Sequence, residues 1–532
     1  MECIKLFFRM ITMVLVIGIA NQSDSNNILA KSEDVAVNKV YEAQPVQCDE
    51  RYIYTTKPRD KGMILDTYPN LHVEAILDEG NRMLLFESYL ILIKADFWPS
   101  GSVTQKKELG TVERNKTTLT IYNIEDRKAP KIIRSIAVEG ELLEIRRKES
   151  QIYFVTRIGS TNKMNQIKVL NDFLPAYEDS KQDDQLNLLP LERVYNVKND
   201  FEMRSAVNVI GSFDLKSNSN LDMIAIVGGK EEIYIEDNKL FLSSVENDNV
   251  RINRVEFTTK GIQYKGSVTL PYSVFHDKIQ CYYEKNFLAT AIISDEDEQF
   301  SCNLYMIDDQ MKQVGKYTFQ CESKGGYNIS FIENKMYIRN VETLVAVIDL
   351  SNPTQLVKAS DMSLPDVMNE LYPIGTGLAV EISHMQTHTQ NIGEWGVTYN
   401  YFGPGGVKIK LFDTSNKAPK KLDELIVGLQ STAVHNEYTA VVNKESNILA
   451  LPVVEIDGDL RYEEKAYVFK VEKNKLVQVG KLEQIKTYKG IYITSEEDYI
   501  FSVGNKLFYF YNNEISEYNI NDLKYIGNMV IE

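Results

Sequence analysis

Two histidines four residues apart form the most suggestive metal-ligand pattern in the sequence. His384 and His388 lie in "EISHMQTHTQNIGEWG", among only five histidines in the chain. On a helix this spacing places two imidazoles on one face, where they can bind a metal ion together with a carboxylate. The stretch instead lies between an alternating strand and "GVTYNYFGPGG", whose composition is typical of a loop. We therefore favour solvent-exposed loop histidines, with a metal site as the alternative.

Four aromatic residues, Trp395, Tyr399, Tyr401 and Phe402, follow in the same stretch. Aromatic side chains on an exposed loop can stack on a sugar or grip a peptide, although loops more often pack them against their own backbone. These four residues are the candidate binding loop.

Four cysteines, Cys48, Cys281, Cys302 and Cys321, remain after the first twenty residues, and an even number permits disulfides in an exported protein. In "SCNLYMIDDQMKQVGKYTFQC" two apolar segments flank a polar turn. We therefore expect Cys302 and Cys321 to face each other across a hairpin, at a separation that suits a disulfide. A pairing of Cys281 with Cys302 is the open alternative.

Known catalytic motifs are absent from the sequence. It contains no G-x-S-x-G elbow, no H-E-x-x-H helix, no Walker loop and no dinucleotide-binding fingerprint. No cofactor is therefore predicted, and an enzyme is the less favoured expectation. An enzyme stays an open alternative, because a catalytic site assembled from residues scattered along the chain leaves no such motif.

The N-terminus has the pattern of an export signal. Lys5 and Arg9 precede an apolar run from Met10 to Ala20, which ends in the small residues that a signal peptidase needs. The run is shorter than the roughly twenty residues that span a bilayer as a helix. We expect a cleaved signal peptide over residues 1–20, with a retained anchor as the alternative, and no transmembrane helix in the mature chain.

The mature chain is expected to be strongly acidic. Removal of residues 1–20 leaves 74 acidic and 57 basic residues. Binding to nucleic acid needs a surplus of Lys and Arg on one face, so no nucleic-acid partner is predicted. The negative charge is first of all a feature of a solvated, soluble surface.

The elements that position these residues are short strands. From about residue 70, alternating segments such as "QIYFVTR" (151–157) and "KLFYFY" (506–511) are broken every eight to twelve residues by Asn, Asp, Gly or Pro. A sequence pattern of one strand, an Asx turn and a second strand recurs, as in "LTIYNIEDRKAPKI" and "IKLFDTSNKAPKK". Helical patterns are weak and are confined to residues 25–45 and 365–371. The chain is therefore predicted to be all-β.

The spacing of these turns predicts a β-propeller. Asp308 to Asp349 is 41 residues, Asp349 to Asp413 is 64, and Asp413 to Glu472 is 59. Periods of this length with several strands each are typical of propeller blades. Turns near 126, 214, 308, 349, 413, 472 and 522, with room for another near 262, indicate seven or eight blades. Two β-sandwich domains are the alternative. The polar stretch 173–204 has the character of an insertion.

These phrases resemble a known family of secreted bacterial and archaeal proteins with a C-terminal β-propeller distantly related to WD-type repeats. The resemblance covers residues 46–532. It rests on the order of "TTLTIYNIEDRKAPKIIRSIAVEGELLEIRRKESQIYFVTR" (117–157), "DFLPAYEDS" (172–180), "GIQYKGSV" (261–268), "VIDLSNPTQL" (347–356) and "GGVKIKLFDTSNKAPK" (405–420). It implies a propeller fold and an extracytoplasmic, bacterial protein, and it implies no established activity.

We therefore expect a signal peptide (1–20), a polar linker (21–45) and a β-propeller (46–532), in which residues 46–70 close the ring. The expected function is a monomeric binding or scaffold module, secreted or at the cell envelope, with a protein or glycan partner. The alternative is an extracellular hydrolase or lyase with titratable residues converging in the propeller funnel.

Overall fold

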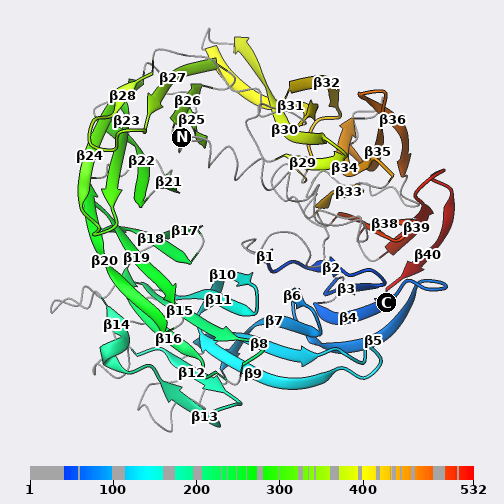
Figure 1. Ribbon diagram of the computed structural model, residues 1–532, viewed down its shortest axis with the longest axis horizontal. Coiled ribbons are helices and arrows are strands. Elements are labelled where there is room, and N and C mark those ends of the chain that lie inside the picture. The colour runs from blue at the N-terminus through cyan, green and yellow to red at the C-terminus, as the bar shows by residue number, and fades with distance from the viewer. Residues whose placement is uncertain are drawn as a thin grey trace.

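Nine small sheets form a ring in the computed structural model. The structure describes residues 41–531 apart from gaps, of which the longest are 99–113, 160–173, 196–205, 360–370 and 483–497. Each sheet contains a four-stranded meander in sequence order. In Figure 1 the first strands β17, β21 and β25 lie towards the middle of the ring, and the fourth strands β20, β24 and β28 lie at its rim.

Three sheets are built from the N-terminal part of the described chain, and two of them carry extra strands. The first sheet is β2 (Val46–Cys48), β3 (Tyr52–Thr55), β4 (Lys61–Asp66) and β5 (His72–Glu79). The second is β6 (Arg82–Phe86), β7 (Tyr89–Trp98), β8 (Arg114–Asn123) and β9 (Lys131–Glu139), extended by β12 (Ala176–Asp179) and β13 (Asp183–Leu188). The third is β10 (Glu141–Lys148), β11 (Gln151–Ile158), β15 (Ala206–Asp214) and β16 (Asp222–Gly228), flanked by β1 (Tyr41–Glu42) and β14 (Val194–Tyr195).

The other six sheets have four strands each. They are β17 (Glu231–Glu236), β18 (Lys239–Glu246), β19 (Asn249–Thr258) and β20 (Gly261–Pro271); β21 (Ile279–Glu284), β22 (Phe287–Glu296), β23 (Gln299–Asp308) and β24 (Gln313–Cys321); and β25 (Tyr327–Ile332), β26 (Lys335–Asn340), β27 (Thr343–Asp349) and β28 (Val357–Lys358). Then follow β29 (Tyr372–Gly375), β30 (Leu378–Ile392), β31 (Thr398–Asp413) and β32 (Lys420–Val427); β33 (Val441–Asn443), β34 (Ile448–Ile456), β35 (Tyr462–Glu472) and β36 (Lys475–Leu482); and β37 (Tyr499–Val503), β38 (Lys506–Tyr511), β39 (Glu514–Asn519) and β40 (Tyr525–Val530).

The all-β propeller predicted from the sequence is confirmed, and a pair of sandwiches is not formed. The described residues contain one sheet more than the larger predicted number of blades. All eight predicted turns join the third and fourth strands of a meander, and the ninth such turn lies between Asp66 and His72. It was missed because β4 is buried at five of its six residues. A strand covered on both faces is a continuous apolar run without alternation.

The core lies between neighbouring sheets. One hydrophobic cluster joins Leu411 and Phe469 of successive sheets, and another joins Ile53 and Leu65 of the first sheet to Phe508 of the last. Phe501 and Phe508 stack with their ring centroids 5.8 Å apart. The ring therefore closes by side-chain packing between two complete sheets, which lie side by side in Figure 1.

The polar insertion joins the rims of two sheets. It lies between β11 and β15, where η3 (Leu191–Arg193) precedes β14. Strand β12 pairs with β9 of the second sheet, and β14 pairs in parallel with β16 of the third. Arg134 of β9 binds Asp179 of β12 through Nε–Oδ1 and Nη2–Oδ2 contacts of 2.9 and 2.7 Å, with both side chains almost fully buried.

The described end of the expected linker belongs to the ring. Tyr41 and Glu42 pair with β10, and Gln44 forms a bridge with Met83 at the first strand of the second sheet. Residues 41–45 are therefore extended and held by two sheets, rather than part of a linker or of a helix over 25–45. Residues 1–40 and the possible helix at 365–370 lie outside the described residues. In the part of the chain that the structure describes, no helix has the length and apolar character to span a bilayer.

Candidate metal centre

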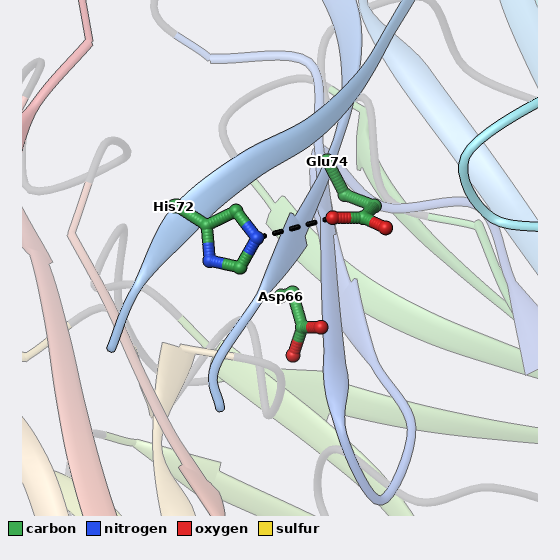
Figure 2. Close-up of side chains that lie close together, drawn as sticks. All are labelled: Asp66, His72 and Glu74. Carbon is green, nitrogen blue, oxygen red and sulfur yellow. Dashed lines mark hydrogen bonds and ion pairs between the residues drawn. The ribbon is translucent and has the colours of Figure 1, made fainter. Parts of the chain in front are cut away.

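The outer hairpin of the first sheet brings three metal-ligating side chains together. β4 ends at Asp66, β5 begins at His72, and these two residues pair directly across the hairpin. The pairing then skips Glu74 at a register shift between Ile64 and Leu65. A bulge of this kind adds one unpaired residue and re-aims its side chain. Figure 2 shows His72 facing Glu74 with Asp66 beside them, and one possible ligand atom of each residue lies within 4.8 Å of the others.

The ring of His72 is oriented by the backbone. Its Nδ1 donates to the carbonyl oxygen of Asn70 over 2.9 Å, and its Nε2 lies 3.1 Å from Oε2 of Glu74. Because a carbonyl oxygen and a carboxylate oxygen both only accept, the protonated ring donates from both nitrogens; in the neutral ring that keeps the proton on Nδ1, Nε2 is free to bind a metal ion. The hydrogen bond to Asn70 raises the pKa of His72 above its ordinary value, and the contact with Glu74 acts in the same direction.

Asp66 is buried and is held by Arg51. Arg51 Nε lies 2.9 Å from Oδ1, and its Nη2 lies 2.5 Å from Oδ2. The backbone N–H of Tyr68 also donates to Oδ1 over 2.9 Å. The hydrogen bond from Arg51 lowers the pKa of Asp66, so the carboxylate is charged at neutral pH. The Arg51 side chain is 53% exposed, which leaves it room to move into solvent.

Glu74 has one carboxylate oxygen without a hydrogen bond. Its side chain is only 7% exposed, and Oε1 is buried without a hydrogen-bond partner. The Lys128 ammonium lies 3.6 Å from that oxygen on a side chain that is 79% exposed. One imidazole and two carboxylates are ligands that divalent transition metals accept in proteins. Without an ion, the same groups form an ion-pair cluster with Arg51 and Lys128.

The two histidines singled out from the sequence lie elsewhere and are not on a loop. Both belong to β30, where His384 pairs with Val407 and His388 with Phe402. Four residues along a strand correspond to about 13 Å, so the backbone does not bring these two positions together. The backbone N–H of Ser431 donates to Nε2 of His384 over 3.0 Å, which occupies the lone pair that a metal would need.

The candidate binding loop is also a strand where the structure describes it. Tyr399, Tyr401 and Phe402 belong to β31, which pairs with β30 along fifteen residue pairs. Trp395 lies outside the described residues. The sequence suggested a loop because "GEWG" and "FGPGG" are rich in Gly and Pro. The second of these phrases lies instead beside a register shift within the hairpin, between Met385 and Gln386.

The predicted cysteine hairpin forms, but its disulfide does not. Cys302 on β23 pairs with Phe319, and Cys321 on β24 pairs with Phe300. The two cysteines are therefore diagonal neighbours, whose roughly 7–8 Å Cα separation exceeds that of a disulfide. The alternative partner Cys281 lies on β21, two strands from β23. Cys48, Cys281 and Cys302 carry thiols in this structure.

Sequence reasoning missed Asp66, His72 and Glu74 altogether. Their stretch, "LDTYPNLHVEA", contains the same signal as the other outer turns, an Asp at the end of a strand followed by Pro and Asn. A search for a ninth copy of that turn would have found it. The convergence itself follows from the register of β4 and β5, which the sequence does not state.

A buried carboxylate outside this cluster gives a pH-dependent prediction. Oε1 of Glu464 on β35 is buried without a hydrogen-bond partner, and burial raises the pKa of Glu464 from 4.5 to about 7. The folded protein therefore favours the neutral acid, and stability is lost as the pH rises from about 4.5 through 7. We expect Glu464→Gln to raise the free energy of unfolding by about 1–3 kcal/mol at pH 8 and to leave it unchanged at pH 4. Urea unfolding at both pH values measures this, and equal effects at both would contradict it.

The sequence pattern of the family described as "Beta propeller domain" matches residues 34–523. The chain belongs to the beta propeller domain family. An uncharacterized protein of Methanocaldococcus jannaschii is 27% identical to this chain over 187 residues. That alignment covers 34% of this chain and only 26% of the relative, so the chain matches about a quarter of the relative's length.

Solved structures similar to this beta propeller domain protein are distant. Apo AztD from Citrobacter koseri is 12% identical with a TM-score of 0.31, covering 93% of this chain and 94% of that one. The dihydro-heme d1 dehydrogenase NirN is 9% identical with a TM-score of 0.32, covering 92% and 74%. A putative 6-phosphogluconolactonase from Bacteroides uniformis is 10% identical with a TM-score of 0.28, covering 61% and 92%. None of these likenesses bears on what the chain binds.

Proposed function

We propose that the protein is an exported binding module that acts outside the cytoplasm and binds a protein partner through the hairpin of β30 and β31. We call its distal part the arm: residues 386–392 of β30 and 398–404 of β31. The export pattern of residues 1–20 supports the location, and the geometry and composition of the arm support the binding role.

The observation that carries the proposal is that the arm extends beyond its own sheet. β29 pairs with β30 only at residues 378–380, and β32 pairs with β31 only from Val407 onwards. Within the residues that the structure describes, the two strands of the arm therefore pair only with each other. Each presents an edge of backbone N–H and C=O groups, which is a template for an added strand.

The composition of the arm leaves these edges unprotected. A quarter of all residues in the chain are Asp, Glu, Lys or Arg, yet Glu394 is the only one between Ile382 and Val407. Natural edge strands are usually blunted by charged residues, Lys above all, because an uncharged edge pairs with other chains. A long uncharged edge therefore favours a binding role, and an extended peptide segment is the partner that such an edge recognises.

The base of the arm is adapted to direct it. Gly406 has a φ of +130°, and a Cβ atom there would lie 2.7 Å from Cγ2 of Ile426 on the neighbouring strand β32. Only glycine fits this position without strain. The pairing also shifts between Met385 and Gln386, and such a bulge bends a hairpin. The alternative of a funnel enzyme has less support, because the one convergent metal-ligating group among the described residues lies on the outer strands β4 and β5.

Shortening the arm tests the proposal. We expect the mature protein, immobilised and exposed to an envelope extract, to retain a protein partner, and a variant with residues 386–404 replaced by Asn-Gly to lose it. The matched control is Val477→Lys, which adds a charge to the exposed strand β36 of the next sheet. Retention by the shortened variant, or loss by the control, would contradict binding through the arm.

A further inference from the structure

The cluster on β4 and β5 points to a second binding site, which does not rest on the arm. We infer that Asp66, His72 and Glu74 bind a divalent transition metal ion, with Zn²⁺ the best match to the donor set. The three donors come from two paired strands, so the backbone already holds them on one face of the hairpin. An ion with bonds of about 2.1 Å needs donors roughly 3.5 Å apart, so donors within 4.8 Å of one another must close by only about 1 Å.

His72 is prepared for metal binding by its contact with Asn70. Ligating histidines almost always donate their other ring N–H to a carbonyl or carboxylate, which fixes the ring and directs the free lone pair at the ion. His72 does this with Nδ1, 2.9 Å from the Asn70 oxygen, while Nε2 faces Oε2 of Glu74.

Glu74 supplies the independent reason to expect a ligand. A buried carboxylate oxygen without a hydrogen bond costs free energy, and Oε1 of Glu74 is such an atom. Lys128 neutralises it only partly, since the ammonium is 3.6 Å away and largely in solvent. A cation bound by Oε2 of Glu74 beside His72 would bring positive charge to the same carboxylate, and bidentate binding would also occupy Oε1.

Arg51 sets the selectivity and gives the sharpest test. It competes with a metal ion for Asp66, and together with Lys128 it balances the two negative charges of the cluster. A site with no net charge binds hard cations such as Ca²⁺ and Mg²⁺ poorly, whereas imidazole favours Zn²⁺ and its neighbours. Removing Arg51 should therefore strengthen metal binding, although the same change removes an ion pair from the structure.

Calorimetric titration of the chelator-treated mature protein with Zn²⁺ tests the site. We expect one equivalent to bind at this site, His72→Ala and Glu74→Gln each to weaken it at least about tenfold, and Arg51→Gln to tighten it about threefold or more. His384→Ala, on β30, is the matched control and should leave this binding unchanged. Circular dichroism of each variant checks that the fold is kept.

Two results would overturn the site: Zn²⁺ binding that is as tight in His72→Ala and Glu74→Gln as in the wild type, or binding that is weakened by Arg51→Gln. Neither result would affect the arm, because the two sites lie on the first and seventh sheets. The variant with the shortened arm should likewise bind Zn²⁺ as the wild type does, even though it no longer captures the partner.

Discussion

Asp179→Ala is expected to lower the free energy of unfolding by about 3–5 kcal/mol, because it leaves the Arg134 guanidinium buried without its counter-charge. The side chains of Arg134 and Asp179 are 3% and 0% exposed, and the pair is bidentate. Arg134 also lies over the ring of Phe213, 5.1 Å from its centroid, so it cannot easily turn to solvent. The loss should be accompanied by faster amide hydrogen exchange in β9 and β12, which the pair joins.

Two controls separate the buried charge from other effects of the substitution. Glu87→Gln removes the partner of Lys216 from a pair whose side chains are 41% and 50% exposed, and it should cost less than about 1 kcal/mol. The double variant Arg134→Met with Asp179→Leu removes both charges and should recover most of the lost stability. A cost below about 1 kcal/mol for Asp179→Ala would show that the insertion is not held to the second sheet by this pair.

Phe508→Ala is expected to lower the free energy of unfolding by about 3–5 kcal/mol, the usual range for replacing a fully buried phenylalanine by alanine. Phe508 is 0% exposed and lies in the cluster that joins the last sheet to the first. Lys506, two residues earlier, donates to the carbonyl oxygens of Thr67 and Pro69 over 3.0 and 3.3 Å, which gives the same seam a polar contact. Urea unfolding with limited proteolysis of residues 41–79 measures the effect.

Phe469→Ala provides the matched control within the ring. Phe469 is also 0% exposed, and its cluster joins two sheets that are consecutive in the chain. If the first and last sheets pack as tightly as consecutive sheets do, the two substitutions should lower the free energy of unfolding by the same amount within about 1 kcal/mol. A small cost for Phe508→Ala beside a large one for Phe469→Ala would mean that the first and last sheets do not form a true seam.

The sequence predicted the turns of this fold better than its strands. Asp and Asn bind their own backbone two residues on, so each outer turn leaves a local signature. The structure contains these bonds: Asp308 accepts from the N–H of Gln310, Asp349 from that of Ser351, and Asn519 from that of Asn521. The tripeptide Asn-Lys-Leu or Asn-Lys-Met, at 238–240, 334–336 and 505–507, is a second local signature, since Lys239, Lys335 and Lys506 each begin the second strand of a sheet.

The register of the strand pairing could not be predicted from the sequence. The Cys302–Cys321 disulfide was wrong by two positions along a hairpin that was itself predicted correctly, because the register of β23 and β24 places Phe319 opposite Cys302. The same limit applies to the metal site, where only the pairing of Asp66 with His72 and the bulge at Glu74 bring the donors together. Bulges leave no dependable mark on a sequence, so contacts that depend on them appear only in three dimensions.

The arm shows a different limit. Its Gly- and Pro-rich phrases are ordinary loop signals, and they misled because a fifteen-residue strand is longer than most strands of a compact sheet. The segment was nevertheless singled out from the sequence, by its two histidines and its four aromatic residues.

The measurement that tests the central claim most directly is site-specific photo-crosslinking in cells that produce the full chain. A photoreactive residue placed at Thr389 or Asn400, in the two strands of the arm, is predicted to give an adduct with the same partner protein. The same residue at Val477 of β36 or Ile526 of β40, both exposed on outer strands, should give none. No adduct from either arm position, or equal adducts from the outer strands, would contradict a binding module that acts through its arm.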